Sequence, residues 1–130
     1  MSDYQEIHYV VDGSVATITM NRPDQLNALT DLTQAEIRHA LDQSETSSNV
    51  IGSVLTGAGR GFCAGVDMNA LGSMSDAGER NTTDFEHLQA TPGNPDDDPN
   101  YSGSPSYFLG LRTSLIAAIN GAAAGWGFSY

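Results

Sequence analysis

Residues 55–68 read Leu-Thr-Gly-Ala-Gly-Arg-Gly-Phe-Cys-Ala-Gly-Val-Asp-Met and lead from an apolar strand into a turn rich in glycine. Glycine lets a ligand approach the main chain closely, and amides at a helix start that lack intrahelical partners stabilise an anionic oxygen. Residues 116–129 repeat this arrangement after a second apolar strand. Two such turns that face each other predict an oxyanion hole.

Three other interpretations of these turns compete with an oxyanion hole. A Walker phosphate loop ends in Gly-Lys-Ser/Thr, and it is excluded because the chain has no lysine. Residues 59–64 match the looser Gly-x-Gly-x-x-Gly/Ala dinucleotide pattern, with Asp84 about twenty residues further on. That match is weak because residues 69–75 contain one glycine and two serines where a helix should follow. Tight structural turns without a ligand are the remaining alternative.

The N-terminal third of the chain predicts a hairpin followed by a helix. Residues 7–11 and 15–20 are rich in β-branched side chains and are separated by Asp12-Gly13-Ser14, which has turn chemistry. Between residues 30 and 44 the apolar positions recur broadly at helical spacing. Thr30 or Asp31 is expected to cap this helix.

Two further strands and a long loop are expected in the rest of the chain. Residues 50–56 are apolar enough for a parallel strand buried on both faces, and residues 115–119 are expected to form a fourth strand. Residues 72–106 are dense in Gly, Ser, Asn, Asp, Thr and Pro, which predicts a long flexible loop within the domain. Its acidic run at residues 96–98 is expected to be a solvated turn rather than a metal site, because no second ligand cluster accompanies it. Together these elements predict an α/β domain.

Length and charge limit the possible functions. A chain of 130 residues fits one domain or a portion of one. Its 16 acidic residues and five arginines give a net charge of -11, which disfavours nucleic acid and anionic membranes as partners. The longest apolar stretch, residues 115–128, is shorter than the roughly 20 residues that cross a bilayer. The single cysteine, Cys63, excludes an intrachain disulfide and fits a cytoplasmic location.

Three motifs follow one another along the chain. Residues 21–29 read Asn-Arg-Pro-Asp-Gln-Leu-Asn-Ala-Leu, residues 62–68 read Phe-Cys-Ala-Gly-Val-Asp-Met, and residues 116–127 read Ile-Ala-Ala-Ile-Asn-Gly-Ala-Ala-Ala-Gly-Trp-Gly. In this order they resemble the crotonase superfamily, the enoyl-CoA hydratase and isomerase family, over essentially the whole chain. The resemblance implies the ClpP/crotonase fold, a spiral of ββα units. Residues 1–130 are expected to be the N-terminal portion of one such domain, which in the family is roughly twice as long.

The resemblance also implies an acyl-CoA thioester substrate, whose enolate is held by the backbone amides of Val66 and Trp126. Arg22 is the best candidate for a phosphate partner, with a surface arginine that caps the hairpin as the alternative. Coenzyme A is part of the substrate, so no separate cofactor and no metal are implied. The full-length protein is expected to form a homotrimer or hexamer. The residues implied to bind the substrate or its CoA part are Arg22, Gln25, Leu26, Ala28, Ala64, Gly65, Asp67, Met68 and Gly125.

The proton-transfer residue expected at such a site does not occur in the chain. Hydratases of the family use two glutamates, and the first would stand three residues after the second donor, where this chain has Ser129. A serine is no ordinary carboxylate base at neutral pH, so Ser129 favours isomerisation or another enolate reaction over hydration. The second glutamate would lie beyond Tyr130. A truncated relative that binds acyl-CoA without turnover is the alternative function.

The other reactive side chains are expected to have structural roles. Asp67 is expected to anchor its turn and cap the next helix rather than to transfer protons. Cys63 is expected to be a buried packing residue, since no base is indicated beside it. His8, His39 and His87 are scattered over the hairpin, the helix and the loop, and each is expected to be structural or on the surface.

Overall fold

The computed structural model describes residues 4–65 and 111–124. The loop predicted at residues 72–106 lies outside these residues. The helices and strands, in chain order, are β1 Ile7–Asp12, β2 Val15–Met20, the short 3-10 helix η1 Pro23–Gln25, α1 Asp31–Thr46, β3 Gly52–Gly57, β4 Gly61–Cys63, β5 Ser114–Ala117 and β6 Ala122–Ala123.

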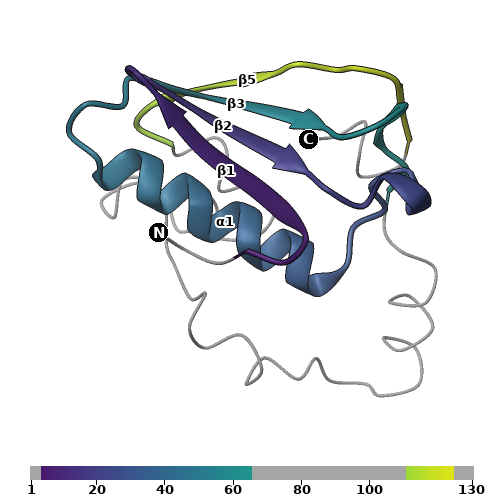
Figure 1. Cartoon of the computed structure of the whole chain (residues 1–130). Helices are drawn as coiled ribbons and strands as arrows, with labels where there is room; N and C mark the ends of the chain where they lie inside the picture. Colours follow the sequence, from purple (N-terminus) through teal and green to yellow (C-terminus); the bar gives the residue numbers. More distant parts are fainter. Residues whose placement is uncertain (1–3, 66–110, 125–130) are drawn as a thin grey trace.

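Strands β1, β2, β3 and β5 lie in this order across one sheet (Figure 1). β1 and β2 form an antiparallel hairpin with Ile7 opposite Met20, whereas β2, β3 and β5 run parallel to one another. Gly13 makes the hairpin turn with φ +60°, an angle that glycine adopts without steric cost. The predicted hairpin, the parallel strand predicted at residues 50–56 and the fourth strand predicted at residues 115–119 are therefore confirmed.

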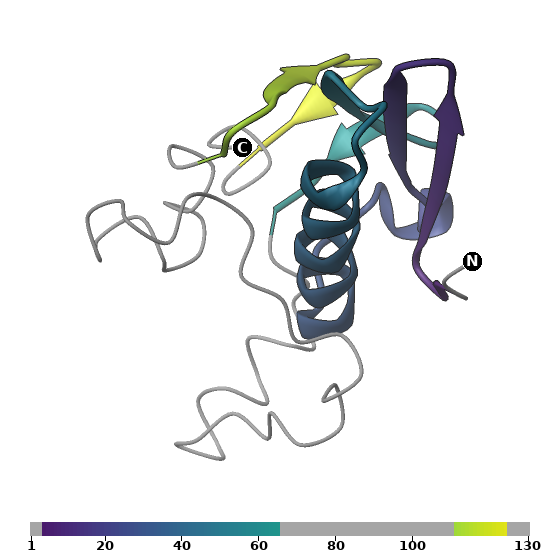
Figure 2. The ribbon, with the colours of Figure 1, turned by 90° about the vertical axis from the view of Figure 1, so that its left-hand side faces the viewer.

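Helix α1 lies along one face of the sheet (Figure 2). At its start, the Thr33 amide donates to Thr30 Oγ1 over 3.1 Å and the Thr30 amide donates to Thr33 Oγ1 over 3.4 Å. This capping box satisfies amides that the first turn leaves without helical partners, so Thr30 is the cap. No helix in residues 4–65 or 111–124 is long and apolar enough to cross a membrane. The core between α1 and the sheet consists of Ile7, Ile18, Met20, Leu29, Ile37, Ala40, Leu41, Leu55, Phe62 and Cys63.

The prediction that the strand at residues 50–56 is buried on both faces is wrong. Ser53 and Leu55 of β3 are buried on the side of α1, whereas the alternate residue Val54 is only partly buried. Ile51 is 72% exposed, and Ile116, opposite Val54 on β5, is 62% exposed. The reason is that α1 is the one helix in the described part of the chain that packs on this sheet, and it covers a single face.

Strands β4 and β6 pair in parallel as a separate two-stranded sheet. Each follows a strand of the main sheet, β3 or β5, through a short turn of small residues. The helix starts that we expected after these turns fall outside the described residues. Within the described residues, the amides and carbonyls of the two segments pair with one another, as in the 3.0 Å bond from the Ala124 amide to the Cys63 carbonyl.

Candidate active site

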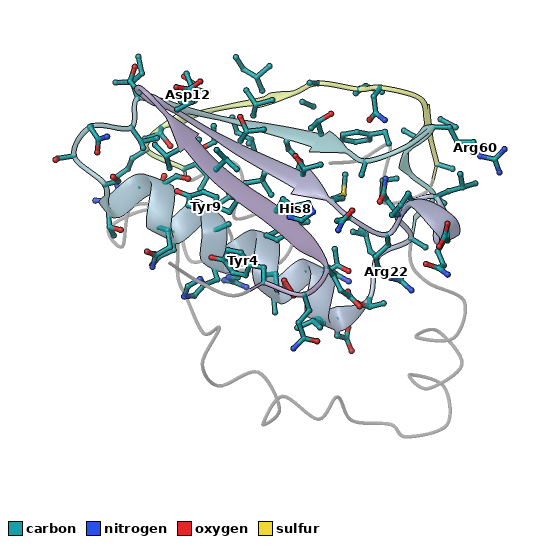
Figure 3. All side chains as sticks on the ribbon, viewed as in Figure 1. Tyr4, His8, Tyr9, Asp12, Arg22 and Arg60 are labelled. Atoms are coloured by element: carbon teal, nitrogen blue, oxygen red, sulfur yellow. The ribbon has the colours of Figure 1, made fainter. Side chains whose placement is uncertain are left out.

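The three sequence motifs meet at one end of the sheet. Residues 21–29 follow β2, residues 58–65 follow β3 and residues 118–124 follow β5, and these parallel strands end side by side. Arg22 and Arg60 mark this end, whereas Asp12 lies at the hairpin tip at the opposite end (Figure 3). The carboxyl ends of parallel strands are a common place for ligand sites in α/β sheets. This end of the sheet is therefore the candidate active site.

The first motif is a compact loop around a buried asparagine. Leu26 and Asn27 both have positive φ, 51° and 57°, a backbone conformation that asparagine tolerates better than most residues. The Asn27 amide donates to the Arg22 carbonyl, and the Arg22 amide donates to Asn27 Oδ1, both over 2.8 Å. These reciprocal bonds close residues 22–27 into a ring around the Asn27 side chain, which is 1% exposed.

Arg22 is bonded within this loop rather than extended into solvent. Its Nη1 donates to the Ala28 carbonyl over 2.5 Å, and its Nε lies 3.8 Å from Glu6 Oε1. Glu6 in turn accepts hydrogen bonds from the hydroxyls of Thr30 and Thr33 at the start of α1. The guanidinium therefore links the loop to the sheet and the helix. Its role as a phosphate partner stays a prediction.

The turn between β3 and β4 is held by two asparagine side chains. Asn27 Nδ2 donates to the carbonyls of Ala58 and Gly61, over 3.0 and 2.8 Å. From the third motif, Asn120 Oδ1 accepts from the Gly57 amide over 3.1 Å, and Asn120 Nδ2 donates to the carbonyls of Gly59 and Gly61 over 3.0 and 3.3 Å. Our sequence interpretation missed both asparagines. Their presence in two separate motifs, Asn-Ala-Leu and Asn-Gly, was the available signal.

Two glycines of these turns are required by close backbone contact. A Cβ at Gly121 would lie 1.9 Å from the Arg60 carbonyl oxygen, and a Cβ at Gly57 would lie 2.7 Å from the Phe62 carbonyl oxygen and 2.8 Å from Asn27 Nδ2. Neither position has room for a side chain. Gly121 thus lets the segments after β3 and β5 touch through their main chains, and Gly57 lets the turn after β3 pack closely on the end of that strand.

The predicted binding residues that the structure describes are brought together. The Ala64 amide donates to the Leu26 carbonyl over 3.0 Å, and the Leu29 amide donates to the Gly65 carbonyl over 2.7 Å. Gln25 and Ala64 are exposed, and Ala28, whose amide donates to the Gln25 carbonyl, is half-buried. Outside the described residues lie the other predicted site residues: Val66, Asp67, Met68, Gly125, Trp126 and Ser129.

The reactive side chains within the described residues fit the structural roles expected of them. Cys63 is buried, and burial raises the pKa of its thiol, which disfavours a nucleophilic thiolate. His39 Nδ1 pairs with the Tyr4 hydroxyl at 2.7 Å, and His8 is exposed on β1. Residues 4–65 and 111–124 contain no group of three His, Cys, Asp or Glu side chains placed to hold a metal ion. The chemistry offered by the described part of the site is that of the main chain.

Comparison with known proteins agrees with this architecture. The sequence profile of the enoyl-CoA hydratase/isomerase family matches residues 11–93. The chain is 36% identical over 132 aligned residues to a probable enoyl-CoA hydratase, EchA14, of Mycobacterium tuberculosis, covering 99% of this chain and 44% of that protein. It is 46% identical over 59 residues to 1,2-epoxyphenylacetyl-CoA isomerase of Escherichia coli, covering 45% of this chain and 22% of that protein.

A solved enoyl-CoA hydratase/isomerase from Mycobacterium paratuberculosis superimposes with a TM-score of 0.67 at 33% identity, covering 97% of this chain and 41% of that one. The alignment with EchA14 covers almost all of this chain, yet the chain spans less than half the length of that curated relative. The expected crotonase-like fold is confirmed by this neighbour and by the family profile. The chain therefore belongs to the enoyl-CoA hydratase/isomerase family.

Proposed function

We propose that the protein containing this chain acts on acyl-CoA thioesters and stabilises an enolate of the thioester with the backbone amides of Val66 and Trp126. The observation that carries the proposal is the pairing of β4 with β6. Val66 follows the Cys63 end of β4 by three residues, and Trp126 follows Ala123 by three. The two proposed donors thus come shortly after, in the sequence, two strands that are hydrogen-bonded side by side.

Amide donors suit this reaction because the charge develops on one oxygen. Preorganised donors aimed at such an oxygen are a large term in catalysis, and removing one typically costs about 3–4 kcal/mol. They also need no particular side chain, so valine and tryptophan are both acceptable at the donor positions. The names of the relatives, probable enoyl-CoA hydratase and 1,2-epoxyphenylacetyl-CoA isomerase, support the same substrate class.

The loop after β2 is proposed to bind the CoA part of the substrate. Its exposed residue Gln25 and half-buried residues Leu26 and Ala28 lie next to the exposed Ala64. Asp67, Met68, Gly65 and Gly125 complete the proposed contacts. CoA is a portion of the substrate, and we propose neither a separate cofactor nor a metal. We further propose a cytoplasmic homotrimer or hexamer for the full-length protein.

Ser129 favours isomerisation or another enolate reaction over hydration. It stands where a hydratase of the family has its first glutamate, and a serine is a poor base for activating water at neutral pH. Isomerisation needs a proton moved between carbons of the enolate rather than an activated water. We therefore place double-bond isomerisation ahead of hydration.

The test is a turnover assay on the complete product of the gene that encodes this chain. Crotonyl-CoA reports hydration and a 3-enoyl-CoA reports isomerisation. We expect turnover of the 3-enoyl-CoA and little hydration. Thermal stabilisation by acyl-CoA without turnover of either substrate would instead support the non-catalytic binding protein. Stabilisation by NAD with indifference to CoA thioesters would contradict the proposal altogether.

A further inference from the structure

The two strands that lead to the proposed donors have little backbone pairing of their own. β4 has three residues and β6 has two, with Gly61 opposite Ala122 and Cys63 opposite Ala123. The register shifts between these two pairs. A short two-stranded ladder is marginal by itself, and an irregular register specifies the alignment of its strands weakly. Some other contact must therefore fix how β4 lies against β6.

Besides the backbone bonds at Ala64 and Gly65, such contacts are made by the side chains of Asn27 and Asn120. The Gly61 carbonyl, at the first residue of β4, accepts a hydrogen bond from both asparagines, over 2.8 Å from Asn27 and 3.3 Å from Asn120. Asn120 is two residues before β6. The start of β4 is therefore bonded directly to the entry of β6 on one side and to the loop after β2 on the other.

We propose that Asn27 and Asn120 are positioning residues, which hold residues 57–61 between them and thereby set the spacing of the two oxyanion donors. This inference rests on the proposed function. Neither side chain is assigned a contact with substrate. Both act through the main chain that leads to the donors.

Asparagine is chemically suited to this task in a way that aspartate is not. Asn120 accepts from the Gly57 amide and donates to the Gly59 and Gly61 carbonyls. One amide group supplies both functions, whereas an ionised carboxylate only accepts. Asn120→Asp would keep the bond from Gly57 and would set a negative charge against two carbonyl oxygens. This substitution therefore pushes the turn away from Asn120 at almost constant side-chain volume.

A purely structural role makes a different prediction from a positioning role. Asn120 is exposed at the surface of the described part of the chain, so its substitution leaves the core under α1 intact. If it served stability alone, Asn120→Asp would lower the melting temperature while each folded molecule kept its kcat. If it positions a donor, kcat falls in fully folded protein. A displacement of about 1 Å at a reacting centre can cost roughly 100-fold in rate.

The experiment uses the complete gene product with the substitutions Asn120→Asp and Asn120→Ala. Asn49→Asp is the matched control, because Asn49 is an exposed asparagine that donates to the Gly13 carbonyl over 3.5 Å at the other end of the sheet. We measure kcat and KM with the acyl-CoA substrate, the melting temperature, and the carbonyl stretch of a bound ¹³C-labelled thioester. The stretch reports how strongly the donors polarise the carbonyl.

For both Asn120 variants we expect kcat to fall about 10- to 100-fold, with KM within about threefold of wild type. The carbonyl stretch should move towards its value in free thioester, and Asn49→Asp should change none of these. Unchanged kcat and stretch in an active protein would overturn the positioning role alone. A wild-type protein that neither binds nor turns over acyl-CoA would overturn the proposed function and, with it, this inference.

Discussion

Replacing Gly121 with alanine tests the backbone contact on which the site depends. The added Cβ would lie 1.9 Å from the Arg60 carbonyl oxygen, whereas a carbon and a carbonyl oxygen approach to about 3.3 Å. The segments around residues 60 and 121 must therefore separate by roughly 1 Å or more. The obstacle is main chain on both sides, so no side-chain rotation relieves it.

The cost of Gly121→Ala has two parts. Overpacking of this kind typically costs about 1–3 kcal/mol. The separation also strains the bonds from Asn120 Nδ2 to the carbonyls of Gly59 and Gly61, each worth about 0.5–1.5 kcal/mol. We expect the free energy of unfolding to fall by about 3 kcal/mol, and kcat per folded molecule to fall about 100-fold.

Gly13→Ala is the matched control for this experiment. Gly13 has nothing within 4 Å of an added Cβ, but its φ is +60°, so the substitution costs about 1–2 kcal/mol of backbone strain and leaves the site untouched. Urea unfolding gives both free energies, and the acyl-CoA assay gives kcat. If Gly121→Ala were as stable and as active as Gly13→Ala, the close approach of residues 60 and 121 would be refuted.

Three further substitutions test the helix cap, the buried carboxyl and the arginine. Thr30→Ala should lower the free energy of unfolding by about 1 kcal/mol in urea, because it removes the cap of α1. Burial raises the pKa of Glu36 above its ordinary 4.5. The difference in unfolding free energy between wild type and Glu36→Gln should therefore fall as the pH rises through the folded-state pKa of Glu36. Urea denaturation of both proteins at several pH values measures this difference. Arg22→Gln should raise KM for acyl-CoA more than for the acyl-pantetheine thioester, if the guanidinium contacts a CoA phosphate.

Each of these has an outcome that would contradict it. Thr46→Ala, at the exposed end of the same helix, is the control for Thr30→Ala, and an equal loss in both would show that the cap adds nothing. A difference between wild type and Glu36→Gln that rises with pH would reverse the sign assigned to burial. Equal increases in KM for both thioesters would show that Arg22 acts by holding Ala28, not by binding phosphate.

The elements that were predictable from the sequence are those governed by local chemistry. The Asp12-Gly13 turn, the β-branched strands beside it and the Thr30 cap each depend on a few neighbouring residues, and each appears in the structure. The one-sided burial of β3 was not predictable, because Val54 and Leu55 are equally apolar and only the position of α1 separates them. The strands β4 and β6 were also missed, because segments of three and two residues carry too little local signal.

The sequence by itself determined the family, because three motifs occur in the order typical of it, and it predicted the oxyanion chemistry that we propose. Only the tertiary structure decided how those motifs are joined. Asn27 and Asn120 lie 93 positions apart in numbering, and nothing in their spacing indicates that both donate to the Gly61 carbonyl. That contact exists because parallel strands end side by side, so residues distant along the chain meet at the same edge of the sheet.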